Sequence, residues 1–146
     1  MSYTNRNEIP EKYKWNLGDI FATPEKWEEA FAELSQEYPQ LADFKGKLAD
    51  REQLLAFLRL SDKIDLKLEQ LYCYASMAYN EDSQDSVRQA RFSKIYGLLT
   101  KYDAATSFVS PELSAISDEQ LKAFIADPDF SDYDVMLKNV LEGKAH

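Results

Sequence analysis

Apolar residues recur every three or four positions along two long stretches of this chain. In residues 50–80 these positions are Leu54, Phe57, Leu60, Ile64, Leu68, Leu71, Ala75 and Ala78. In residues 85–109 they are Phe92, Ile95, Leu99, Tyr102, Thr106 and Val109. This spacing places each set on one face of an α-helix. Because only the polar residues 81–84 separate the two helices, the pattern predicts a long antiparallel helical hairpin whose apolar stripes pack together.

Capping signals predict shorter helices beside the hairpin. Thr23–Pro24 provides a cap and a first-turn proline for a helix that Tyr38–Pro39 ends. Residues 41–48 are expected to form a helical turn or a connector. Asp50 and Gln53 stand three positions apart, which is typical of the start of a helix.

After the hairpin, Ser110–Pro111 is expected to end the second long helix. Ser117 then caps a helix over residues 118–126, and an amphipathic segment over 133–141 closes at Gly143. Strand signals are weak throughout. The predicted fold class is therefore all-α: a long antiparallel hairpin with shorter flanking helices and an N-terminal arm.

Length and composition fit one helical domain. The 146 residues are 45% hydrophobic and include only four Gly and five Pro, which favours long uninterrupted helices. We predict a single domain over 1–146, with an arm over 1–23 and a helical body over 24–146. The expected anchors of the arm are Trp15, Leu17, Ile20 and Phe21.

Charge and cysteine content exclude several classes of protein. A formal net charge of −9 disfavours nucleic acid and acidic membrane surfaces as partners. No apolar run approaches the ~20 residues of a membrane span, and residues 1–6 contain no signal core. The single cysteine, Cys73, forms no internal disulfide, which is typical of a reducing compartment. We expect a cytoplasmic protein.

Residue types that support catalysis are scarce. The only histidine is His146, and Cys73 has no activating base or cation beside it, so a buried, unreactive Cys73 is expected. Residues 127–133 alternate oxygen-bearing side chains as a calcium loop does, but Asp132 and Lys138 stand where that loop needs Gly and Glu. Asn80, Glu81, Asp82 and Asp85 cluster at the tip of the hairpin. They fit a solvated loop, in which Asp82, Ser83 or Asp85 caps the next helix, better than a weak cation site. We predict no catalytic, cofactor-binding or metal-binding residue in this chain.

Five tyrosines offer the most specific functional signal. Tyr72, Tyr74, Tyr79, Tyr96 and Tyr102 cannot all point into one narrow helix seam, so some face either the arm or a ligand cleft. Packing against the arm is the favoured alternative. Tyr72 and Tyr79 lie seven positions apart and share a helix face. If that face is exposed, its rings and hydroxyl groups suit a peptide backbone.

Two segments resemble the oligoendopeptidase F family. Ile9 to Phe21 (IPEKYKWNLGDIF) resembles the opening of those proteins, where a Trp-Asn/Asp-Leu pattern precedes an Ile/Leu-Phe/Tyr pair. Tyr74 to Asp82 (YASMAYNED) resembles the end of the family's first long helix. The order and spacing of the expected helices agree as well. The chain is thus similar to the N-terminal quarter of a family member.

The resemblance implies a cytoplasmic, almost wholly helical zinc metalloendopeptidase that cleaves oligopeptides in a deep cleft. Its catalytic signature, His-Glu-x-x-His with a downstream Glu, is missing here, so no catalytic residue carries over. The resemblance therefore implies a segment that is inactive alone and forms part of the cleft wall. Its expected partners are the remaining catalytic domain of the same polypeptide, which would hold zinc, and oligopeptide substrates.

A second interpretation is a free-standing helical module that binds a partner helix or a peptide through its hairpin. A complete enzyme of another type has little support, because the usual acid–base and nucleophile sets are missing. Since a segment of a larger protein exposes the apolar face that meets its neighbour, self-association through the hairpin is also expected.

Overall fold

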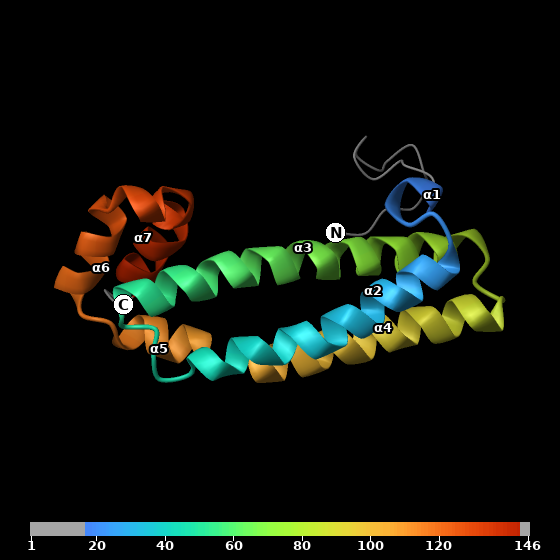
Figure 1. Ribbon diagram of the computed structural model, residues 1–146, viewed down its shortest axis with the longest axis horizontal. Helices are drawn as coiled ribbons and strands as arrows, with labels where there is room; N and C mark the ends of the chain where they lie inside the picture. The colour runs from blue at the N-terminus through green and yellow to red at the C-terminus, as the bar shows by residue number, and fades with distance from the viewer. Residues whose placement is uncertain (1–16, 144–146) are drawn as a thin grey trace. The chain divides into compact units, whose positions relative to one another are not determined.

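The computed structural model describes residues 17–143, and every regular element among them is helical (Figure 1). The predicted all-α class is confirmed. In chain order the elements are α1 (Leu17–Ile20), α2 (Pro24–Glu37), the 3₁₀ helix η3 (Tyr38–Phe44), α3 (Arg51–Glu81), α4 (Ser86–Ala105), α5 (Val109–Ala115), α6 (Asp118–Ala126), the 3₁₀ helix η4 (Pro128–Tyr133) and α7 (Asp134–Gly143).

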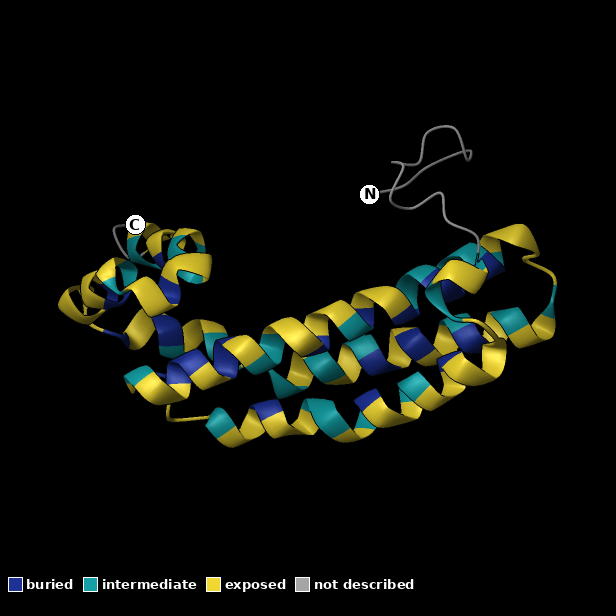
Figure 2. Cartoon of the chain, turned by 45° about the horizontal axis from the view of Figure 1, so that its top comes forward, coloured by how far each residue is buried: buried dark blue, intermediate teal, exposed yellow. Residues whose placement is uncertain are grey.

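The chain forms two compact units, and the long helix α3 contributes to both. Among the described residues, the first unit contains 17–37 and 65–100, and the second contains 38–64 and 101–143. Buried and exposed residues alternate along the helices, as amphipathic helices require (Figure 2).

In the first unit, α2 packs against the hairpin of α3 and α4. Trp27 of α2 is fully buried, and its indole Nε1–H donates a 2.9 Å hydrogen bond to the carbonyl oxygen of Leu71 in α3. The hairpin is closed by Arg88 of α4, whose Nη1 donates to the carbonyl oxygen of Ala78 at 2.8 Å. Within this unit, the predicted antiparallel pairing of the two long helices is confirmed.

The buried stripe of α3 agrees with the prediction, whereas that of α4 keeps Ile95 and is shifted by one residue at the positions on either side of it. Of the eight positions predicted on α3, only Leu60 is half-buried rather than buried. On α4 the buried residues are Arg91, Ile95 and Leu98, and the predicted Phe92 and Leu99 are half-buried. The shift arises because α4 also contacts α2, which turns its buried face away from a simple two-helix seam.

Helix starts follow local hydrogen bonding, as predicted. The side chains of Thr23, Asp50 and Ser117 accept bonds from backbone N–H groups three residues later, at 3.2, 3.0 and 3.2 Å. At the hairpin tip, Asp85 Oδ1 accepts from the N–H groups of Val87 and Arg88. The acidic loop therefore caps α4, as the favoured interpretation required.

One predicted boundary is wrong. Ser110–Pro111 does not end the second long helix: α4 ends at Ala105, and Ser110–Pro111 lies in the first turn of α5. A proline is compatible with a first turn, because the N–H groups there have no partner within the helix. The predicted last helix begins at Asp134, since Tyr133 belongs to η4.

In the second unit, the start of α3 is held by ionic contacts and aromatic packing. Arg51 donates from Nε to Asp127 Oδ2 at 2.8 Å and from Nη2 to Asp129 Oδ2 at 2.6 Å. Its guanidinium also lies over the ring of Phe130, which is fully buried and stacks on Phe124 at 5.1 Å. The segment predicted not to be a calcium loop thus binds an arginine of its own chain.

Candidate functional site

Four aromatic side chains of α3 and α4 form a continuous cluster in the first unit. The ring of Phe92 stacks on Tyr79 at 5.0 Å and lies 5.1 Å from Tyr96 and 6.1 Å from Tyr72. Tyr72 and Tyr96 meet edge to face at 6.3 Å. Tyr96 is 52% exposed, so the cluster reaches solvent. We call these four residues the aromatic face.

Helical periodicity places the aromatic face away from α2. Tyr74 and Arg91 point toward Trp27 of α2, since the Arg91 guanidinium lies over both the Trp27 and the Tyr74 rings. Successive helix positions differ by about 100°. Tyr72 is therefore on nearly the opposite side of α3 from Tyr74, and Phe92 is turned well away from Arg91.

The aromatic face combines apolar area with hydrogen-bonding groups. Partial burial, followed by the nearby Tyr96 hydroxyl, raises the pKa of Tyr72 above its ordinary value. The shift favours the neutral hydroxyl, which both donates and accepts hydrogen bonds and already has such contacts with Tyr96 and Ser76. Rings with neutral hydroxyls provide the apolar and polar contacts that an extended peptide needs.

The two explanations offered for the tyrosines apply to different residues. Tyr74 is buried, and the ring of Phe21 meets it edge to face at 5.5 Å. Phe21 belongs to the predicted arm, so Tyr74 fits the arm-packing explanation. Leu17 and Ile20 are half-buried, and Trp15 lies outside the described residues. Tyr72, Tyr79 and Tyr96 make up most of the aromatic face instead.

Arg91 is a candidate that the sequence did not reveal. It is only 8% exposed, and its Nε atom is buried without a hydrogen-bond partner, the one such side-chain atom within residues 17–143. Its guanidinium carbon lies 5.8 Å from the Trp27 ring centre and 5.6 Å from that of Tyr74. A buried arginine without a carboxylate is unusual, because burial of an unpaired charge is costly.

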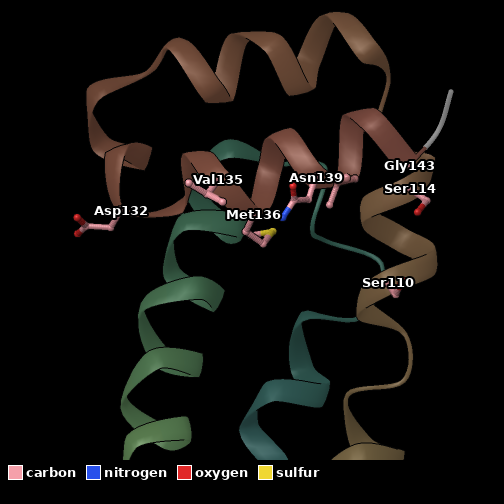
Figure 3. Close-up of a pocket in the computed structure, with 8 residues that line it drawn as sticks. Ser110, Ser114, Asp132, Val135, Met136, Asn139 and Gly143 are labelled. Carbon is pink, nitrogen blue, oxygen red and sulfur yellow. The ribbon is translucent and has the colours of Figure 1, made fainter.

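A groove lies in the second unit (Figure 3). Its volume is about 670 Å³. Met136 and Asn139 lie next to each other on α7, whereas Asp132 points away from them (Figure 3). The lining residues come from α5, η4 and α7: Ser110, Ser114, Asp132, Val135, Met136, Asn139, Val140 and Gly143. Small hydroxyls, one carboxylate and aliphatic groups form no recognisable catalytic arrangement.

The remaining candidate residues do not form a site. Cys73 is half-buried, rather than buried as predicted, because it lies at the edge of the packed face of α3. His146 lies outside the described residues. Within residues 17–143, no group of three or more His, Cys, Asp or Glu side chains could hold a metal ion. None of the described helices is both long and apolar enough to span a membrane.

Comparisons with known proteins give the relationship. Group B oligopeptidase PepB of Streptococcus agalactiae serotype III (strain NEM316) is 34% identical over 97% of this chain and 24% of its own length. Oligoendopeptidase F, plasmid, of Lactococcus lactis subsp. cremoris is 32% identical with the same coverage. The chain corresponds to an N-terminal segment of the oligoendopeptidase F peptidases. The predicted resemblance is confirmed.

Further comparisons agree with this relationship. Oligopeptidase PepF of Bacillus subtilis (strain 168) is 34% identical over 83% of this chain and 18% of its own length. A crystal structure of a candidate peptidase from Chlamydophila abortus has the same fold, with a TM-score of 0.82 and 23% identity over 95% of this chain. No family model matches the chain. The chain spans about a quarter of the length of most of these relatives.

Proposed function

We propose that this chain forms part of the wall of the substrate cleft in an oligoendopeptidase F-like peptidase and cleaves no peptide alone. The aromatic face is the observation that supports this proposal. Relatives named as oligopeptidases match 97% of the chain, so a peptide is the ligand that this surface is expected to meet. Tyr96 is half exposed and Tyr72 keeps a neutral hydroxyl, so the aromatic face offers both contacts that an extended peptide requires. A rigid helical wall would also hold such a peptide in place for attack.

Catalysis is assigned to another part of the polypeptide. The family signature needs two histidines on one helix, and this sequence contains a single histidine. The described residues do not fit zinc, since no group of three potential ligands comes together among them. We therefore assign zinc to the catalytic remainder of the same polypeptide, which is the expected partner of this chain. Both parts are expected to work in the cytoplasm.

A direct test uses the purified 146-residue chain. It is incubated with an oligopeptide and zinc, and the products are followed by mass spectrometry. No cleavage is expected, whereas cleavage that copurifies with the chain and survives further purification would contradict the proposal.

A second test places this chain in a working enzyme. The chain replaces the matching quarter of Streptococcus agalactiae PepB, and oligopeptide cleavage is compared in Tyr96→Ala and Val87→Ala versions of the chimera. Val87 is the matched control, because it is 64% exposed on α4 outside the aromatic face.

Loss of the Tyr96 ring is expected to raise KM about two- to tenfold with little change in kcat, as suits a lost binding contact. Val87→Ala should change neither constant. Equal kinetics for both variants would contradict the cleft-wall role. A folded but inactive chimera, together with peptide binding by the chain alone, would favour a free-standing binding module.

A further inference from the structure

We propose that Arg91 is the binding residue for a carboxylate group that residues 17–143 do not supply. The proposed function enters only through the choice of a peptide as one of the probes. Arg91 is deeply buried, and aromatic rings lie on its guanidinium.

The other buried or half-buried cations of the described chain already have oxygen partners. Arg51 binds Asp127 and Asp129, and Arg88 binds Glu81 and a backbone carbonyl. Lys67, which is half-buried, pairs with Glu37. Arg91 is more deeply buried than these residues, and its Nε has no hydrogen-bond partner among the described residues.

The two aromatic rings compensate for the charge of Arg91 only in part. The Trp27 and Tyr74 rings attract the cation through their π electrons. The N–H groups of a guanidinium, however, lie in its own plane and need acceptors there, and a ring face accepts a hydrogen bond only weakly. The Nε–H donor of the guanidinium therefore remains without an acceptor among the described residues.

A carboxylate fits this arrangement better than other groups. Its two oxygens match the planar donor fork of arginine, and its negative charge neutralises the buried cation. The low dielectric around Arg91 strengthens that attraction. Arg91 as a whole is 8% exposed, whereas its Nε atom is buried, so an incoming carboxylate must displace part of the packing around Nε to reach it.

Trp27 provides a reporter for the test, because its indole lies against Arg91. A Trp15→Phe substitution leaves Trp27 as the single tryptophan of the chain. Its indole N–H resonance and fluorescence are followed during titration with acetate, with N-acetyl-trialanine and with N-acetyl-trialanine amide. Sodium chloride at equal ionic strength is the reference.

Both carboxylates are expected to give a saturable change that chloride and the peptide amide do not. Arg91→Met should weaken this binding about tenfold or more, the value of a charge-assisted hydrogen bond. Lys94→Met is the matched control and should retain it, because Lys94 is on the same helix and near an aromatic ring but is already paired with Glu28.

Arg91→Lys keeps the charge but not the planar donor fork, so it should also bind the carboxylates more weakly. This variant decides the test if circular dichroism shows that Arg91→Met is unfolded. A change that chloride reproduces, or that persists in folded Arg91 variants, would overturn the proposal.

The same titration distinguishes two sources of the carboxylate. Tighter binding of the peptide acid than of acetate would identify a peptide C-terminus. Equal binding would show that the carboxylate alone is recognised, as expected for a side-chain carboxylate of adjoining protein. The proposed function can fail in the chimera while this site stands, since the Trp27 signal requires no cleavage.

Discussion

Leu68 and Leu66 allow burial to be tested with unusually close controls. They lie two positions apart on α3, yet Leu68 is 5% exposed and Leu66 is 56% exposed. Replacement by Ala makes the same chemical change at both positions. Leu68→Ala is expected to lower the free energy of unfolding by ~2–5 kcal/mol, whereas Leu66→Ala should change it by less than about 0.5 kcal/mol.

The aspartate variants enlarge this difference. Leu68→Asp places an unpaired carboxylate among apolar groups, and its cost adds to the lost packing. Because a whole domain has only ~5–15 kcal/mol of stability, this variant should unfold the hairpin. Leu66→Asp faces solvent and should remain folded. Urea denaturation followed by far-UV circular dichroism measures all four variants, and equal effects at the two positions would refute the burial pattern and the hairpin pairing derived from it.

Three further predictions concern ionic, tyrosine and surface groups. Arg51 lowers the pKa of Asp127, so the ionised pair stabilises the fold at pH values above the unfolded pKa of about 3.9, and this stabilisation is lost as the pH falls through the lower folded pKa. Arg51→Met should therefore flatten the decline of the melting temperature below about pH 4. An unchanged dependence of the melting temperature on pH would contradict this. Burial and the 2.7 Å bond to Asp62 raise the pKa of Tyr133 to about 12, so ultraviolet titration of Asp62→Asn should show one tyrosine ionising at lower pH than before, and identical curves would exclude the contact. Self-association through the hairpin predicts that sedimentation detects a dimer of the unaltered chain and that Tyr96→Glu favours the monomer, while a strict monomer at high concentration would count against it.

The helix caps could be predicted because they depend on neighbouring residues alone. Thr23, Asp50 and Ser117 each bond to a group three residues away, so the sequence contains the whole interaction. The boundary at Ser110–Pro111 was assigned wrongly for a related reason. A proline marks a first turn as readily as a helix end, and only the break in α4 after Ala105 distinguishes them.

The buried position of Arg91 could not be predicted from local pattern. Arginine counts as polar in a hydrophobic stripe, and its burial depends on Trp27 and Tyr74, which lie far away in the sequence. The same contact between α4 and α2 moved the buried stripe from Phe92 to Arg91. A prediction that considered only the pairing of α3 with α4 therefore missed Arg91, the residue of α4 that contacts α2.

The aromatic face was partly predictable because a hairpin needs only one apolar stripe on each helix. Tyr72 and Tyr79 lie outside the predicted stripe of the first long helix. Their spacing of seven residues predicts that they share a helix face, whichever residues pack against them. The structure adds Phe92 and Tyr96 from α4 and leaves Tyr96 half exposed. These rings join α3 to α4, but they take no part in the contact with α2, which packs on the other side of the hairpin. Apolar surface beyond what packing requires is where a binding role is best sought.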